Sequence, residues 1–198
     1  MTVELAEANH FHLVDARLTL TLCLDKAPDG NGRPAFIRPI RPADLEALRA
    51  IARDSHRQSR FFYDHQFAAS RTEDLYVRWI EASASGYADA VWIGEQEGKP
   101  GGYVSCHLSP DGTGRIGLLA VSPAARGNGL AREMLAASLE YFRKNGMNRV
   151  SVVTQGRNVA AQRLYQRCGF LTESLQLWYH RWFLPNGLDP GPAEKGAP

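Results

Sequence analysis

A glycine-rich turn between an apolar strand and a long amphipathic helix limits the folds open to this 198-residue chain. The turn is Arg126-Gly127-Asn128-Gly129-Leu130-Ala131, and it joins an apolar run ending at Val121 to a helical pattern that continues to Lys144. Glycines let a ligand approach the backbone closely, and a helix N-terminus offers free N–H groups and the positive end of its dipole to an anion. Arg126 adds a guanidinium for the same anion. The segment therefore predicts either a phosphate-binding turn in an α/β domain or a plain connection between strand and helix.

Periodic patterns in the first half of the chain predict two strands and two helices. Residues 18–24 alternate Leu with Thr or Cys, the period of a half-buried strand, and the turn at 28–32 ends it. A short strand follows at 36–38, and Pro42 can open the first helix. Ser70-Arg71-Thr72-Glu73 has the form of a capping box, which would start the second helix.

The second half reads as a meander followed by two helices and two strands. Gly112-Thr113-Gly114-Arg115-Ile116-Gly117 matches G-x-G-x-x-G, but an apolar strand follows it instead of a helix, so we interpret it as a hairpin turn. The expected elements are strands at 91–94, 103–108 and 116–121, a helix ending at Asn145-Gly146, a strand at 150–153, a helix capped by Asn158 and stopped by Gly169, and a strand at 175–183.

Charge and composition exclude several classes of protein. The formal net charge is only +2, which gives no strong field for nucleic acid or an anionic membrane. No run of 18 apolar residues and no signal peptide is visible. The cysteines Cys23, Cys106 and Cys168 form no CxxC or Cys/His cluster. We therefore expect a cytoplasmic protein with no disulfide framework, no metal site, and no nucleic-acid or membrane partner.

Several segments taken together resemble the GNAT superfamily of N-acetyltransferases. They are the strand at 116–121, the turn at 126–131, which fits the R/Q-x-x-G-x-G/A motif of that superfamily, and residues 154–158 and 164–170. The resemblance implies the α/β (α+β) GNAT fold, a mixed, largely antiparallel twisted sheet flanked by helices, with two neighbouring strands splayed apart. It divides the chain into an N-terminal extension with one strand (1–34), the acetyltransferase domain (35–184) and a disordered tail (185–198).

The same resemblance implies a site for acetyl-CoA as acyl donor. The backbone of Leu119 and Val121 would pair with the pantetheine arm, and Asn158 would also contact the cofactor. Tyr165 would be the general acid that protonates the departing thiolate, although on an amphipathic helix it also fits a core aromatic. The pyrophosphate would be held by Arg126, Gly127, Asn128, Gly129, Leu130 and Ala131.

Within the superfamily the chain looks most like the dTDP-fucosamine acetyltransferases, which N-acetylate a nucleotide-linked 4-amino-4,6-dideoxy sugar. The matching residues lie at 59–67, 75–80, 115–120 and 154–155. This implies a small-molecule amine as acceptor, a nucleotide-linked amino sugar. The side chains that would line its cleft, each also interpretable as core packing, are Arg60, Phe61, Tyr76, Trp79 and Trp178.

Several alternatives stay open. The resembled enzymes carry a longer N-terminal region, which leaves room for a protein N-terminus or another small amine as acceptor. A non-catalytic acyl-CoA sensor and a homodimer are open as well. A general base need not exist, because a sugar amine need not be strongly protonated near pH 7. If there is one, the candidates are Asp64, His65, Glu73, His107 and His180.

Overall fold

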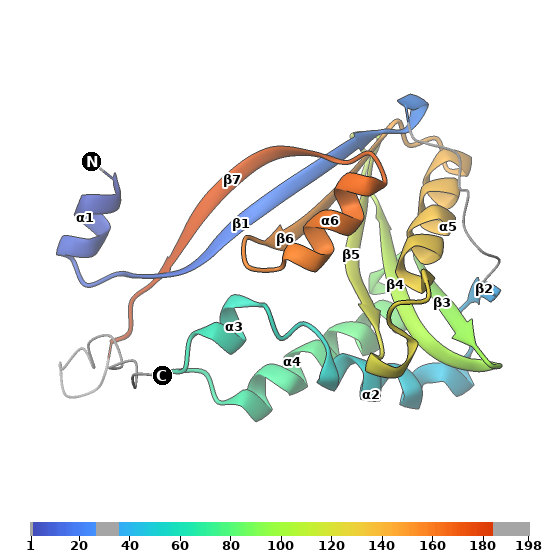
Figure 1. Cartoon of the computed structure of the whole chain (residues 1–198), viewed down its shortest axis with the longest axis horizontal. Coiled ribbons are helices and arrows are strands. Elements are labelled where there is room, and N and C mark those ends of the chain that lie inside the picture. Colours follow the sequence, from blue (N-terminus) through green and yellow to red (C-terminus); the bar gives the residue numbers. More distant parts are fainter. Residues whose placement is uncertain (1, 27–35, 184–198) are drawn as a thin grey trace.

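The computed structural model describes residues 2–26 and 36–183. They form a sheet flanked by helices (Figure 1). The strands are β1 His12–Cys23, β2 Phe36–Pro39, β3 Ala90–Gln96, β4 Lys99–Leu108, β5 Thr113–Val121, β6 Arg149–Gln155 and β7 Leu171–His180. The helices are α1 Thr2–Ala8, α2 Leu45–Asp54, α3 Arg60–Tyr63, α4 Ala69–Ala82, α5 Leu130–Lys144 and α6 Val159–Arg167.

The seven strands form one sheet in the order β2-β3-β4-β5-β6-β1-β7. Each neighbouring pair is antiparallel except β5 with β6, which run parallel. The expected meander is thus confirmed as β3-β4-β5, and α5 is the crossover that links the parallel pair. The first strand of the chain lies inside the sheet, between β6 and β7. In Figure 1, β1 and β7 continue together beyond the other strands as a two-stranded ribbon with α1 at its far end.

Two hydrophobic cores lie on opposite faces of the sheet. One includes Leu135 and Phe142 of α5 together with Tyr165 of α6. The other includes Leu48 of α2 and Ile80 of α4. Side chains of a strand alternate between faces, and β4 accordingly sends Val104 and Cys106 to the first core and Tyr103 to the second. The mixed, largely antiparallel sheet flanked by helices confirms the expected GNAT fold class.

The helices of the first half differ in part from the sequence expectation. The helix expected after Pro42 is confirmed, since a single 3₁₀ turn there runs into α2. The capping box is wrong, because α4 begins at Ala69 after the extended Ala68, and no side chain caps it. Glu73, the last residue of the expected box, is paired with Arg57 at 2.9 Å. Two helices were expected in this half, and the short α1 and α3 were missed.

The boundaries of the later elements follow the sequence closely. Asn158 caps α6, as expected, because its Oδ1 accepts from the N–H of Ala161 at 3.2 Å. Gly169 ends that helix with a left-handed φ of +89°, a conformation that favours glycine. The last strand begins at Leu171, four residues before the expected start. The turn expected at 28–32 and the tail expected at 185–198 lie outside the described residues.

A buried ion pair fixes the edge of the sheet near α2. Arg38 of β2 donates to both carboxylate oxygens of Asp44, at 2.6 and 2.7 Å, and to Glu95 of β3 at 2.6 Å. The Arg38 and Asp44 side chains are 8% and 7% exposed. The hydrogen bonds from Arg38 hold the pKa of Asp44 below its usual value. This pair connects the start of α2 to the sheet, and α2 forms part of one wall of the candidate site.

Candidate active site

The sheet opens between its two parallel strands. Residues 113–116 of β5 pair with 149–152 of β6, and the ladder ends there. At the same point the register of β5 against β4 shifts, so that Gly117 and Leu118 together stand opposite Ser105. Such a bulge bends the strand that carries it. The Ser105 hydroxyl accepts the N–H of Leu118 at 2.8 Å, which satisfies a donor that the bulge removes from the ladder.

Beyond the bulge, β5 turns backbone polar groups toward the opening between β5 and β6. The N–H of Ser122 donates to the Gly101 carbonyl of the β4 side at 2.8 Å. Backbone groups alternate in direction along an antiparallel strand, so Ala120 faces β4 while Leu119 and Val121 face the opening. Arg126 reaches the Val121 carbonyl on this side, with its Nε 3.2 Å away. An extended amide chain could therefore pair with Leu119 and Val121 as a further strand would.

The turn at 126–131 presents open backbone at the end of that edge. Gly127 and Gly129 have φ of +84° and +83°, and a Cβ at either would meet nothing within 4 Å. Gly129 is the N-cap of α5, and no side chain caps the helix. The first N–H groups of the helix lack helical acceptors, so they and the dipole are available to an anion.

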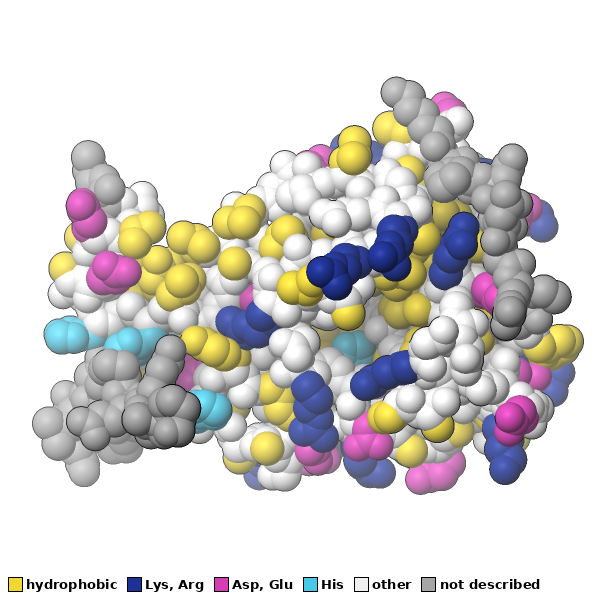
Figure 2. Space-filling model, in the orientation of Figure 1, with side chains coloured by type: hydrophobic (Ala, Val, Ile, Leu, Met, Phe, Trp, Pro, Cys, Tyr) yellow, Lys and Arg dark blue, Asp and Glu magenta, His cyan; other side chains and the backbone are white. Residues whose placement is uncertain are grey.

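A cavity of about 610 Å³ lies over this turn, between α5 and α6. Its lining includes Gly127, Gly129, Leu130 and Ala131. Figure 2 shows basic side chains gathered on the face where α5 and α6 lie next to each other. The arginines that line this cavity are Arg126, Arg132, Arg163 and Arg167. Four guanidinium groups around exposed N–H groups fit a pyrophosphate. Asn128 of the same turn lines neither this cavity nor the larger one.

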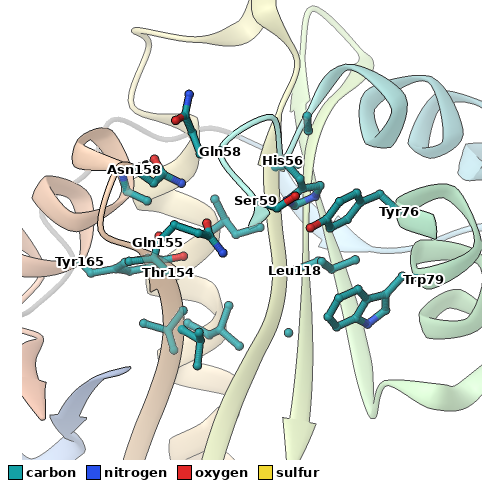
Figure 3. A pocket seen from close by; sticks show the side chains of 18 of the residues that line it. His56, Gln58, Ser59, Tyr76, Trp79, Leu118, Thr154, Gln155, Asn158 and Tyr165 are labelled. Atoms are coloured by element: carbon teal, nitrogen blue, oxygen red, sulfur yellow. Dashed lines mark hydrogen bonds between the residues drawn. The ribbon is translucent and has the colours of Figure 1, made fainter. Parts of the chain in front are cut away.

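A larger cavity, of about 990 Å³, passes through the opening of the sheet. In Figure 3, Thr154, Gln155, Asn158 and Tyr165 lie on one side of β5, and His56, Ser59, Tyr76 and Trp79 lie on the other. Of the residues expected from the sequence, this cavity brings together Leu119, Val121, Arg126, Ala131, Asn158, Tyr165, Arg60, Phe61, Tyr76, Trp79 and Trp178.

Tyr165 lies where α6 borders the opening. Its ring is 5% exposed and packs against Phe170, with 5.7 Å between ring centroids. Burial raises the pKa of the phenol well above its ordinary value of 10. The phenol carries its proton at neutral pH. In Figure 3 the ring projects from α6 toward Thr154.

Arginine and aromatic side chains form one end of the larger cavity. The Arg60 guanidinium lies 4.3 Å from the ring centroids of both Phe61 and Trp178. Arg17 lies 5.4 Å from the Trp178 ring and donates to Gln176 at 2.8 Å. Such stacking holds guanidinium groups in place while their N–H groups can still bind an anion.

The charge of the larger cavity is strongly positive. Among the described residues that line this cavity, the acidic side chain is that of Asp54. The cationic ones are Arg17, Arg57, Arg60, Arg115 and Arg126. Arg57 is paired with Glu73 at 2.9 Å, but the remaining arginines still outnumber Asp54. This imbalance favours a negatively charged ligand over a cationic one.

His56 is a cavity residue that sequence reasoning missed. It has a φ of +58°, uncommon for a residue other than glycine. Its ring stacks on Tyr76 with 4.5 Å between centroids, and its Nε2 lies 3.1 Å from the Tyr103 hydroxyl. Burial lowers the pKa of His56 to about 4, so it is neutral at pH 7. The only sequence signal was a polar residue after a helix end, which is too common to single out.

The described residues contain no group of three or more His, Cys, Asp or Glu side chains that could hold a metal ion. Cys168 lines the smaller cavity, and burial raises the pKa of its thiol, so it is not a ready thiolate. None of the described helices is long and apolar enough to cross a membrane.

A mixed sheet opens along one parallel pair, with an uncapped helix N-terminus beside the opening and a buried phenol at it. This is the arrangement that the acetyltransferase fold expected from the sequence requires. Comparison of sequences gives the family. The chain belongs to the acetyltransferase (GNAT) family, whose sequence profile matches residues 45–170.

Curated relatives include several acetyltransferases. Spore coat polysaccharide biosynthesis protein SpsD of Bacillus subtilis (strain 168) is 33% identical over 159 residues, which cover 80% of this chain and 53% of SpsD. The dTDP-fucosamine acetyltransferase of Escherichia coli O6:H1 is 30% identical over 173 residues, 86% of this chain and 72% of that enzyme. Mycothiol acetyltransferase of Beutenbergia cavernae is 32% identical over 128 residues, 61% of this chain and 41% of that enzyme. The chain thus spans between two fifths and three quarters of these relatives.

A solved structure supports the fold assignment. A GCN5-related N-acetyltransferase from Sphaerobacter thermophilus superposes with a TM-score of 0.69 at 19% identity, covering 90% of this chain and 55% of that one. At this identity the likeness concerns the fold alone.

Proposed function

We propose that this protein transfers the acetyl group of acetyl-CoA to the 4-amino group of a dTDP-linked 4-amino-4,6-dideoxy sugar. Its membership of the GNAT family supports acetyl-CoA as donor and a small amine as acceptor. The likeness to dTDP-fucosamine acetyltransferase supports an amino sugar. The observation that carries the proposal is the larger cavity, which joins the Leu119 and Val121 edge and Tyr165 to the arginine and aromatic end.

The residues on the α5 side fit the donor. Leu119 and Val121 would pair with its amide-bearing arm, and Arg126 with the free N–H groups of the turn would bind its pyrophosphate. The open space at Gly127 and Gly129 supports this, because a side chain there would fill the approach to the backbone. Asn158 uses its oxygen to cap α6. Its amide N–H groups are left for the donor.

Tyr165 would serve as the general acid. The amine nitrogen attacks the acetyl carbon of the thioester, the carbon–sulfur bond breaks, and the Tyr165 phenol gives its proton to the departing thiolate. The protonated phenol is the form that this step requires.

The arginine and aromatic end of the cavity would bind the nucleotide part of the acceptor. Arg17 and Arg60 provide positive charge for the diphosphate, and Trp178, which lines the cavity beside them, would contact the base. Tyr76 and Trp79 would border the sugar. The positive lining opposes polyamines and the charged N-terminus of a peptide. The three free thiols, Cys23, Cys106 and Cys168, support a cytoplasmic setting.

A panel of acceptors tests this proposal. Purified protein is mixed with acetyl-CoA and, in separate reactions, a dTDP-4-amino-4,6-dideoxyhexose, the same amino sugar without the nucleotide, a polyamine and a short peptide. Thiol release is followed for each. We expect kcat/KM to be highest for the nucleotide sugar. The amino sugar without the nucleotide should have a lower kcat/KM because its KM is higher. A faster reaction with the peptide or polyamine would overturn the sugar assignment and leave acetyl transfer standing.

A further inference from the structure

The path of the donor along β5 indicates where its reactive end would lie. Its pyrophosphate would bind beside Arg126, and its arm would pair first with Val121 and then with Leu119. Continued in the same direction, the arm brings the thioester to Gly117, at the bulge where β5 leaves β6. A group that removes a proton from the attacking amine must therefore be close to Gly117.

His107 of β4 contacts Gly117 directly. A Cβ added at Gly117 would lie 2.6 Å from Nε2 of His107, 3.0 Å from its Cδ2 and 2.7 Å from Oγ of Ser105. A Cβ at this place would force the His107 and Ser105 side chains to move. The same contact shows that the Nε2 edge of the imidazole faces the bulge. His107, Gly117 and Tyr165 all line the larger cavity.

Tyr87 also contacts the His107 ring. The imidazole hydrogen-bonds the Tyr87 backbone, and because this bond favours the protonated ring, the imidazole is the donor. The Tyr87 ring meets it edge-on, with 5.2 Å between centroids and 67° between planes. A ring nitrogen committed to a backbone acceptor determines the tautomer. The other ring nitrogen then carries the lone pair that can accept a proton.

Burial leaves the His107 imidazole neutral near pH 7. Burial lowers its pKa below the usual 6.5, and the nearby Arg115 lowers it further. Asp89 and the Tyr87 bond act in the opposite direction but are outweighed. Partial burial keeps the shift smaller than at His56, whose pKa of about 4 makes it a weak base.

The other candidate bases are engaged elsewhere. Asp64 accepts from Nδ1 of His180 at 2.6 Å and from Trp182 at 3.0 Å. Glu73 is paired with Arg57, and His65 is exposed. Asp64, His65, Glu73 and His180 do not line the larger cavity.

We propose that His107 is the general base of the acetyl transfer, an inference that rests on the proposed function. As the amine nitrogen forms its bond to the acetyl carbon, the imidazole of His107 takes the proton that this nitrogen loses. The carbon–sulfur bond breaks, and Tyr165 protonates the sulfur. The products are the amide and free CoA thiol. Proton exchange with solvent then returns His107 to its neutral form and Tyr165 to its protonated form.

The test uses His107→Gln, which keeps a hydrogen-bond donor for Tyr87 but removes the base. The matched control is His65→Gln, which changes an exposed imidazole outside the cavity. Single-turnover rates are measured with the nucleotide sugar from pH 5 to 9, together with acetyl-CoA affinity and melting temperature. A second variant, His107→Ala, is assayed with and without added imidazole.

We expect His107→Gln to lose roughly 10²- to 10⁴-fold in single-turnover rate. Acetyl-CoA affinity should be unchanged. The wild-type rate falls as pH drops through the His107 pKa, because only the neutral ring accepts a proton, and this acidic limb disappears in the variant. Imidazole restores part of the His107→Ala rate, and His65→Gln behaves as wild type.

Two results would overturn this role. One is a His107→Gln rate within about twofold of wild type, which would exclude His107 as the general base and leave the proposed function intact. The other is a slow variant that keeps the acidic limb and is not rescued by imidazole, which would assign His107 a structural part. Acetyl transfer by wild type to none of the tested amines would overturn both proposals.

Discussion

Removing a single oxygen atom, by Tyr165→Phe, tests the proposed general acid with little change to the fold. The ring is almost fully buried against Phe170 and would keep that packing. The phenol oxygen makes no hydrogen bond with the described part of the chain. Its loss therefore leaves no buried partner unsatisfied. We expect the free energy of unfolding and the acetyl-CoA affinity to change by less than about 1 kcal/mol.

The chemical step should suffer far more. General acid catalysis typically contributes roughly 10²- to 10⁴-fold, equivalent to about 3–5 kcal/mol of activation free energy. The thiolate would leave unprotonated, and nothing in the variant replaces the donor. We expect the single-turnover rate to fall by that factor.

Rapid-quench single-turnover assays measure this step without interference from product release. Calorimetry with acetyl-CoA and thermal melting provide the comparison. The matched control is Tyr141→Phe, which removes a phenol that borders neither cavity. A Tyr165→Phe rate within about twofold of wild type, or a loss of rate that follows a loss of stability, would refute the general-acid role.

Four further predictions concern the donor, the acceptor and the fold. Gly129→Asp should raise the Kd of acetyl-CoA in calorimetry by more than about tenfold, because the new side chain repels the donor by its bulk and its charge. Gly98→Asp is the control for backbone strain, since Gly98 is another open glycine with a φ of +73°, and this variant should bind acetyl-CoA normally. Arg60→Gln should raise the KM of the nucleotide sugar roughly 10- to 100-fold in steady-state assays, with little change in kcat, and a lowered kcat alone would argue against the diphosphate contact. Arg38→Gln should cost about 3–5 kcal/mol in denaturant unfolding, because it leaves Asp44 buried and unpaired. The pKa of Asp44 is held below 3.8 in the folded protein, so wild type should lose stability as the pH falls below about 4. A melting temperature that does not change over this pH range would contradict the ion pair.

Local signals made much of the fold predictable. The turn at 126–131, the Asn158 cap and the Gly169 stop each depend on residues close together in the chain. The meander followed from alternating strands and turn residues. These signals also located Leu119, Val121 and Tyr165 on the correct elements.

Other features depend on contacts between distant residues. The bulge at Gly117 appears only when β5 is aligned with β4, and the contact with His107 follows from it. The start of α4 was mispredicted because Glu73, the acidic residue of the expected capping box, pairs with Arg57, sixteen residues earlier, and does not cap the helix. The place of β1 between β6 and β7 joins the two ends of the chain. No local pattern carries such information.

The most direct test of the proposed activity is transfer of a labelled acetyl group. Wild-type protein is mixed with acetyl-CoA carrying ¹³C at the carbonyl and with a dTDP-4-amino-4,6-dideoxyhexose, and the label is followed by NMR. We expect the thioester signal to be replaced by the signal of an amide carbonyl that is bonded to the nitrogen at C4 of the sugar. A thioester signal that persists while calorimetry shows bound acetyl-CoA would contradict acetyl transfer to this amine and favour a protein that binds acyl-CoA without using it.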